Sequence, residues 1–166
     1  YDNDGDMDMY LARRHERSEV AAEDCLYENT GYGVFRRSST KTGKDTVTTL
    51  ALWGDLDGDL DLDLILLSVF TVYLNDGTGN FLEQERGLKD FKHNWYIHQA
   101  LLFDEDRDGD LDLFVVMDFP YLFRNDGTGY FDINRKETLY NAKKKTNLSL
   151  PACDLGDIDN DGFPEI

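Results

Sequence analysis

Short runs of alternating and continuous apolar residues divide the chain into predicted β-strands separated by polar turns. Four strands are predicted at 96–103, 113–117, 121–124 and 131–134, where β-branched and aromatic residues are enriched. Four more are predicted in the same order at 47–53, 64–69, 72–74 and 81–84. The pattern indicates an all-β protein built from a repeated four-stranded unit.

An acidic loop lies between the first two predicted strands of the later unit, over residues 104–112. Acids stand at loop positions 1, 3, 5, 7 and 9, and Gly109 stands at position 6. Oxygens on alternate residues of a tight turn suit a hard cation, and an all-carboxylate cage favours calcium over magnesium. An EF-hand would need a glutamate at position 12 and flanking helices. Position 12 is Val115, and the following residues suit a strand, so we expect the loop to join two strands.

The acidic loop recurs at about fifty-residue spacing, with position 5 at Asp4, Asp59, Asp108 and Asp161. A second signature, centred on Asn-Asp-Gly, keeps the same register at 26–35, 73–81 and 122–131 and predicts hairpins in which Asn and Gly supply positive φ. Four antiparallel strands at this period are the unit of a β-propeller blade. We expect one partial propeller domain, with blades at 1–40 (partial), 45–90 and 94–140 and the start of a fourth at 146–166. The chain starts and stops within a motif, so it is expected to be a piece of a larger protein.

Loops three and four give the clearest candidate metal ligands. In the third, Asp104, Asp106, Asp108 and Asp112 would coordinate through carboxylates, and Asp110 at position 7 through its backbone carbonyl. The fourth loop offers the corresponding set, in which Phe163 stands at position 7: Asp157, Asp159, Asp161, Phe163 and Glu165. The alternative for every loop is an acidic turn that stays solvated and free of metal.

The second loop departs from this pattern and can be aligned in two ways. One frame uses Asp55, Asp57, Asp59 and Asp63, which aligns the following strand but places Leu60 where glycine is expected. The other uses Asp55, Asp57 and Asp61, which restores Gly58 to position 6 but leaves Trp53 at position 1. The first frame is preferred, with weaker or distorted binding. The first loop retains Asp2, Asp4 and Asp8 without a position 1 acid, so we expect three to four calcium ions in total.

The net charge of −17 over 166 residues belongs to these loops. They hold 19 of the 34 acidic residues and one basic residue, so the rest of the molecule is nearly balanced. Such loops repel themselves when empty, which favours divalent ions as part of the folded state. No basic stripe suits nucleic acid, and no apolar run is long enough to insert in a membrane. Basic connectors, including Arg36, Arg37, Lys41 and Lys44, are either a rim for an anionic glycan or lipid or solvated loops that balance the acids.

Taken together, the acidic loops and the Asn-Asp-Gly-Thr-Gly-x-Phe hairpins resemble the FG-GAP/VCBS repeat family, which includes the propeller heads of integrin α subunits. The residues that carry the resemblance lie at 53–57, 104–112 and 156–162 and in the hairpins. The resemblance implies a β-propeller with calcium between the first two strands of a blade. It also implies an extracellular, periplasmic or cell-surface protein that acts in adhesion, carbohydrate binding or scaffolding.

We therefore expect a calcium-stabilised propeller module that binds a protein or glycan outside the cytoplasm, where millimolar calcium would fill loops of ordinary affinity. A lectin-like or adhesion surface, with aromatic residues stacking on sugars, is the alternative. The propeller of a carbohydrate-active enzyme ranks third, because metal-ligand spacing already explains each acidic pair. No catalytic residue is predicted.

Overall fold

A computed structural model describes residues 1–12, 24–40, 42–43, 48–67, 69–88, 97–117, 120–137, 154–162 and 164, without the side chains of 133–137. These residues contain no helix and form three antiparallel sheets in which neighbours in the chain pair in space. Sheet I contains β1 (Met9–Leu11), β2 (Cys25–Asn29) and β3 (Phe35–Arg37). Sheet II contains β4 (Ala51–Gly54), β5 (Asp63–Leu66), β6 (Thr71–Asn75) and β7 (Phe81–Gln84). Sheet III contains β8 (Gln99–Phe103), β9 (Asp112–Val116), β10 (Pro120–Asn125) and β11 (Phe131–Glu137).

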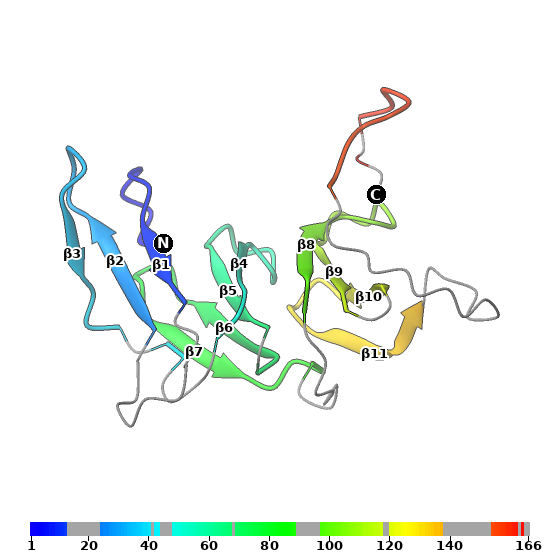
Figure 1. Cartoon of the computed structure of the whole chain (residues 1–166), viewed down its shortest axis with the longest axis horizontal. Coiled ribbons are helices and arrows are strands. Elements are labelled where there is room, and N and C mark those ends of the chain that lie inside the picture. Colours follow the sequence, from blue (N-terminus) through cyan, green and yellow to red (C-terminus); the bar gives the residue numbers. More distant parts are fainter. Residues whose placement is uncertain are drawn as a thin grey trace.

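The three sheets lie side by side in chain order, as consecutive blades of a propeller do (Figure 1). The predicted all-β class and the four-stranded antiparallel blade are thereby confirmed. The first strand of each full blade is shorter than predicted, since β4 begins at Ala51 and β8 at Gln99. Single hydrogen bonds from Leu67 N to Leu50 O (3.0 Å) and from His98 N to Val116 O (2.8 Å) extend the pairing just beyond the strand ends. Residues 47 and 96, the predicted starts, lie outside the described residues. The predicted blade boundaries stay predictions.

Central strand β5 is buried on both of its faces, which explains its continuous apolar sequence. Leu64 and Leu66 point toward sheet I, in a cluster that includes Tyr10, Trp53 and Phe81. Ile65 points the other way and belongs to a second cluster. Because successive residues of a strand face opposite sides of the sheet, one strand supplies the core on two sides.

The second cluster joins sheets II and III and is the largest apolar core among the described residues. Val72 of sheet II and Val115, Phe123 and Phe131 of sheet III are each 0% exposed in it. A third cluster, on the far side of β9, contains Phe103, Phe114, Val116 and Leu122, with Leu155 packed against it. Sheets II and III therefore bury apolar faces against one another, and sheet II also packs against Tyr10 of sheet I. This stacking places the acidic loops next to one another.

The hairpins between the third and fourth strands differ from prediction in one respect. Positive φ falls at Gly77 and Gly79 (77° and 79°) and at the equivalent glycines of sheet III. Asn75 and Asn125 are instead the last residues of β6 and β10, with strand pairing to Phe81 and Phe131. The prediction that Asn supplies positive φ is wrong, because the two glycines of Asn-Asp-Gly-Thr-Gly adopt it at no Cβ cost. The asparagine side chain is thereby available for another role.

Candidate metal centres

The nine-residue acidic segments, here called cation loops, connect the first two strands of a blade. Loop 2 (55–63) runs from β4 to β5 and loop 3 (104–112) from β8 to β9, while loop 1 (positions 2 to 9, residues 1–8) leads into β1. Loop 4 spans 157–165, of which residues 163 and 165 lie outside the described residues. The predicted candidates Phe163 and Glu165 therefore have no described position.

All four loops share one backbone course, in which positions 4 and 6 have positive φ. In loop 3 these are Arg107 (65°) and Gly109 (99°), and in loop 2 they are Gly58 (77°) and Leu60 (74°). Loop 2 therefore follows the first of the two frames, with Asp63 at position 9. Its glycine and its bulky residue have exchanged places, so the Leu60 side chain, 85% exposed, sits where Cβ sterics disfavour it.

In loops 2, 3 and 4, the carboxylate at position 1 organises the turn by accepting backbone hydrogen bonds from inside the loop. Asp104 accepts from the N–H groups of Asp108 (3.1 Å) and Gly109 (3.0 Å). Asp55 accepts from Gly58 (2.8 Å) and Leu60 (3.0 Å) in the same way. These bonds wrap the loop around its acids, so the remaining carboxylate oxygens are turned toward a common centre.

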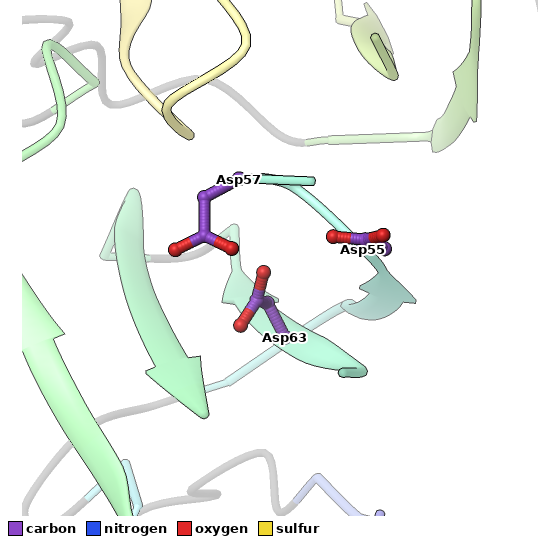
Figure 2. A group of neighbouring side chains, drawn as sticks. All are labelled: Asp55, Asp57 and Asp63. Atoms are coloured by element: carbon purple, nitrogen blue, oxygen red, sulfur yellow. The ribbon is translucent and has the colours of Figure 1, made fainter. Parts of the chain in front are cut away.

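Three acidic groups could each hold one cation in the described part of the chain: Asp55, Asp57 and Asp63; Asp104, Asp106 and Asp108; and Asp157, Asp159 and Asp161. Within each group one oxygen per residue lies within 4.8 Å of the others. Two oxygens on opposite sides of a calcium ion are about 5 Å apart, since each Ca–O distance is about 2.3–2.6 Å. Figure 2 shows the first group, with the Asp57 and Asp63 carboxylates facing one another and Asp55 across the loop. The spacing therefore fits a calcium coordination sphere.

Asp57 gives the most direct test of whether loop 2 suits a cation. Its Oδ1 atom is buried and accepts no hydrogen bond from any described residue. Burial, followed by the charge of Asp59, raises the pKa of the Asp57 carboxyl above its usual value. A buried carboxylate oxygen without a partner is costly, and a metal ligand removes that cost. The residues of loop 2 therefore fit a hard cation.

Loops 3 and 4 differ from loop 2 because arginines contact their acids. Arg124 of β10 pairs with Glu105 (2.6 Å) and with Asp106 at position 3 of loop 3 (3.1 Å). Arg107, at position 4 of loop 3, pairs with Asp161 of loop 4. A guanidinium on a ligand carboxylate competes with a metal for that oxygen. The sequence predicted weaker metal binding at loop 2 than at loops 3 and 4. The contacts in the structure give no reason for that ranking.

In loops 2 and 3, position 9 is the most deeply buried acid. Asp63 is 0% exposed and Asp112 is 1% exposed. Asp112 accepts the N–H groups of Glu105 (3.0 Å) and Asn125 (2.9 Å), and Asp63 accepts those of Leu56 (2.9 Å) and Asn75 (2.8 Å). Burial raises the pKa of each carboxyl to about 6 against these hydrogen bonds. This residue clamps the loop to the hairpin of its own blade, whether or not it also binds metal.

The remaining predicted ligands lie outside the three acidic groups. Asp59 accepts a hydrogen bond from the N–H of Asp61, as Asp4 does from Asp6. The side chains of Asp61 and Asp110 lie against the hairpin glycines, so only their backbone carbonyls remain as candidates at position 7. Asp2 and Asp4 belong to loop 1 and are in none of the three groups. In the same loop, Asp8 repeats the position 9 clamp by accepting the N–H of Asn29 (2.8 Å).

Sequence reasoning missed the hairpin asparagines as site residues. Asn75 and Asn125 are 4% and 5% exposed, and their side chains contact the cation loops. The available signal was the recurrence of Asn before the turn in all three repeats, at 29, 75 and 125. Turn geometry alone is enough to explain that recurrence, so the sequence did not point to a contact with the loops. The Arg124 ion pairs had no repeated signal, because the equivalent residues are Glu28 and Leu74.

A family model for the FG-GAP-like repeat matches residues 1–66, which include loops 1 and 2, all of sheet I, and β4 and β5. Residues 1–66 are therefore similar to an FG-GAP-like repeat. The predicted resemblance is confirmed for this segment. Loop 3, which lies beyond the match, repeats the backbone course and the position 9 clamp of loop 2. No match was found among curated proteins or among solved structures.

The described residues include no helix with the length and hydropathy to cross a bilayer.

Proposed function

We propose that this FG-GAP-like chain is a calcium-stabilised propeller segment that serves as an extracellular binding or scaffold module. The carrying observation is the buried, unpartnered Oδ1 of Asp57 beside Asp55 and Asp63. Calcium bound there would neutralise these carboxylates, which otherwise repel one another and lose hydrating water at a cost in free energy. The protein's own part is to hold β4 and β5 at a fixed separation, so that the exposed connectors keep one geometry.

The test is calcium titration of chelator-treated protein by calorimetry and thermal unfolding. A ligand that binds only the folded state raises its stability, by about 2.7 kcal/mol at a hundred times Kd. Asp57→Asn should remove one binding event and reduce the rise in Tm, whereas Glu83→Gln, with the same charge change on an exposed residue of β7, should leave both intact. Absence of heat and of any shift in Tm at millimolar calcium would overturn the proposal.

The ligand frame is tested separately in loops 1 and 3. Asp108→Ala should blunt the calcium-induced rise in Tm more than Asp6→Ala, because the side chain of Asp6 occupies the position that offers only its backbone carbonyl. Equal effects of the two substitutions would contradict the proposed frame.

A second candidate function, glycan binding, is favoured by a polar cleft of about 500 Å³ between sheet I and the hairpin of sheet II. Its volume lies in the range of small-molecule sites. A chain of hydroxyls crosses it, from Tyr1 to Ser38 (3.2 Å), to Thr40 (3.0 Å) and on to the carbonyl of Gly79 (3.1 Å). Arg36 and Arg37 also line the cleft, with Asp2 and Glu28 balancing their charge. Such a lining suits a neutral saccharide better than an anionic one.

A glycan array followed by titration of the positive sugars would test this function. Ser39 lines the cleft and is exposed, so Ser39→Trp should fill the space and abolish binding, whereas Ser39→Ala should retain it. Equal binding by both variants would place any glycan site elsewhere.

A further inference from the structure

The hairpin asparagine of sheet III bridges two cation loops. Nδ2 of Asn125 donates one hydrogen bond to the carbonyl of Leu111 in loop 3 (3.3 Å). It donates a second to the carbonyl of Leu56 in loop 2 (2.8 Å), which belongs to sheet II. Oδ1 of Asn125 meanwhile accepts the N–H of Gly129 (3.0 Å). The buried side chain of Asn125 therefore makes hydrogen bonds on both sides of the interface between sheets II and III.

Sheet II repeats the arrangement toward sheet I. Nδ2 of Asn75 donates to Leu62 of its own loop (3.2 Å) and to Tyr1 of loop 1 (2.8 Å). Tyr1 and Leu56 both stand at position 2 of their loops. The equivalent asparagine thus bonds to the equivalent carbonyl of the preceding loop at two successive interfaces. This repetition argues against an accidental contact.

Position 2 is where such a contact affects cation binding, because it lies between the ligand positions 1 and 3. The N–H of Leu56 donates to Asp63, its carbonyl accepts from Asn125, and its side chain is 1% exposed in the core between sheets II and III. The peptide that carries Asp55 and Asp57 is therefore fixed from its own blade and from the next blade together.

We propose that Asn75 and Asn125 are positioning residues that couple cation binding at one loop to the docking of the following sheet. Asn125 holds the Asp55 and Asp57 carboxylates of loop 2 in their cation-binding arrangement. By linkage, a cation in loop 2 strengthens the seating of the sheet III hairpin on sheet II by the same factor. This inference rests on the proposed calcium binding and adds that the loops do not act independently.

Position 4 gives a parallel contact at other interfaces. Asn3 of loop 1 donates to Asp61 of loop 2 (2.5 Å), and Arg107 of loop 3 pairs with Asp161 of loop 4. Loop 2 has Gly58 at position 4, so no side chain from that position reaches loop 3. Among the described residues, the hydrogen bonds of Asn125 therefore link loops 2 and 3, and this interface gives the cleanest test.

The test uses terbium as a luminescent substitute for calcium. Trp53 lies on β4, two residues before Asp55, so in a Trp95→Phe background the part of the sensitised emission that Asp57→Asn removes reports occupancy of loop 2. Asn125→Ala should weaken terbium binding at loop 2 on the order of five- to tenfold, within the range of ordinary coupling energies. Thr128→Ala is the matched control, since it removes the hydroxyl bond to Asp126 in the same hairpin and leaves Asn125 in place. It should leave the loop 2 affinity unchanged.

Unchanged affinity in Asn125→Ala, with binding intact in the parent, would overturn the coupling but not the proposed function. No terbium binding in the parent would instead contradict the proposed function at loop 2.

A second measurement covers the case in which Asn125→Ala does not fold. Hydrogen exchange of the parent should show calcium-dependent protection over residues 122–131, and Asp57→Asn in loop 2 should lower that protection. Protection of this hairpin that is indifferent to Asp57→Asn would also overturn the coupling.

Discussion

The backbone conformation of Leu60 costs stability, although loop 2 keeps the same backbone course as the other loops. Its φ of 74° falls in the left-handed region, where the Cβ atom clashes with the neighbouring peptide, and its side chain is 85% exposed. Nothing in the core compensates for this conformation. Loop 2 keeps the backbone of loop 3, so the hydrogen bonds to Asp55 and the sheet contacts around the loop override a local preference.

Leu60→Gly is expected to stabilise the protein by about 1 kcal/mol, because glycine adopts positive φ without the Cβ cost. Chemical denaturation with and without calcium measures the effect. The matched substitution Gly58→Ala places a Cβ at φ 77° in the same loop and should destabilise by a similar amount. A loss of stability in Leu60→Gly would contradict the frame assigned to loop 2.

The buried environment of Asp63 predicts how a substitution there changes the stability of the protein. Asp63→Asn keeps the size but points an NH₂ group at one of two backbone N–H donors, those of Leu56 and Asn75. We expect a loss of about 1–3 kcal/mol in unfolding free energy, the cost of an unsatisfied buried donor. Asp59→Asn, on an exposed part of the same loop, should cost less. Denaturant unfolding of both chelated variants provides the comparison.

The cation loop and the hairpin of a blade form one folding element in spite of their separation in sequence. Position 9 accepts an N–H from each of them, as Asp112 does from Glu105 and Asn125. Position 7 lies against the hairpin glycine from the other direction. Both signatures recur in register along the sequence because each requires the other in space.

The charge state of this element should make calcium binding depend on pH. Burial raises the folded pKa of Asp63 and Asp112 to about 6, above the unfolded value near 3.9. In the metal-free protein these groups favour folding below about pH 4, and this contribution is lost as pH rises through 6. Calcium requires the ionised carboxylates, so protons compete with it in that window.

The calcium-induced rise in Tm should therefore grow between about pH 5 and pH 7. Thermal unfolding with calcium and with chelator at each pH measures it. A rise that stays constant, or that shrinks toward neutral pH, would argue against ionised Asp63 and Asp112 in the bound state.

Across the whole molecule, sheets II and III share one core. Ile65 and Val72 on one side and Val115, Phe123 and Phe131 on the other are fully buried together. A four-stranded sheet exposes two broad faces, so each sheet depends on its neighbours for most of its apolar burial. The arrangement predicts that adjacent sheets unfold together.

Ile65→Ala should lower the unfolding free energy by about 2–5 kcal/mol, through lost burial and the cavity left behind. Hydrogen exchange should show faster opening in β8–β11 as well as in β4–β7, although only sheet II carries the substitution. Leu82→Ala, at a side chain that is 64% exposed, is the control and should have little effect. Faster opening limited to sheet II would mean that the sheets are independent.

The local pattern of the chain determined its strands, their antiparallel order and the position of the acidic loops between first and second strands. Strand periodicity, hairpin glycines and alternating acids are all encoded within a few residues, so sequence reasoning could recover them. It could also recover the burial of β5 on both faces, since a continuous apolar run such as 64–67 has no exposed side. These features account for most of the blade.

Only the tertiary structure decided how one blade acts on the next. The frame of loop 2 depended on strand pairing of Asp63 with Gly54, which overrode the preference of Leu60. The arginine contacts to Asp106 and Asp161 join residues whose partners vary from repeat to repeat. The bond from Asn125 to Leu56 spans 69 residues. Such contacts form where stacked sheets bring distant loops together, so their physical cause is packing and no short segment of sequence encodes them.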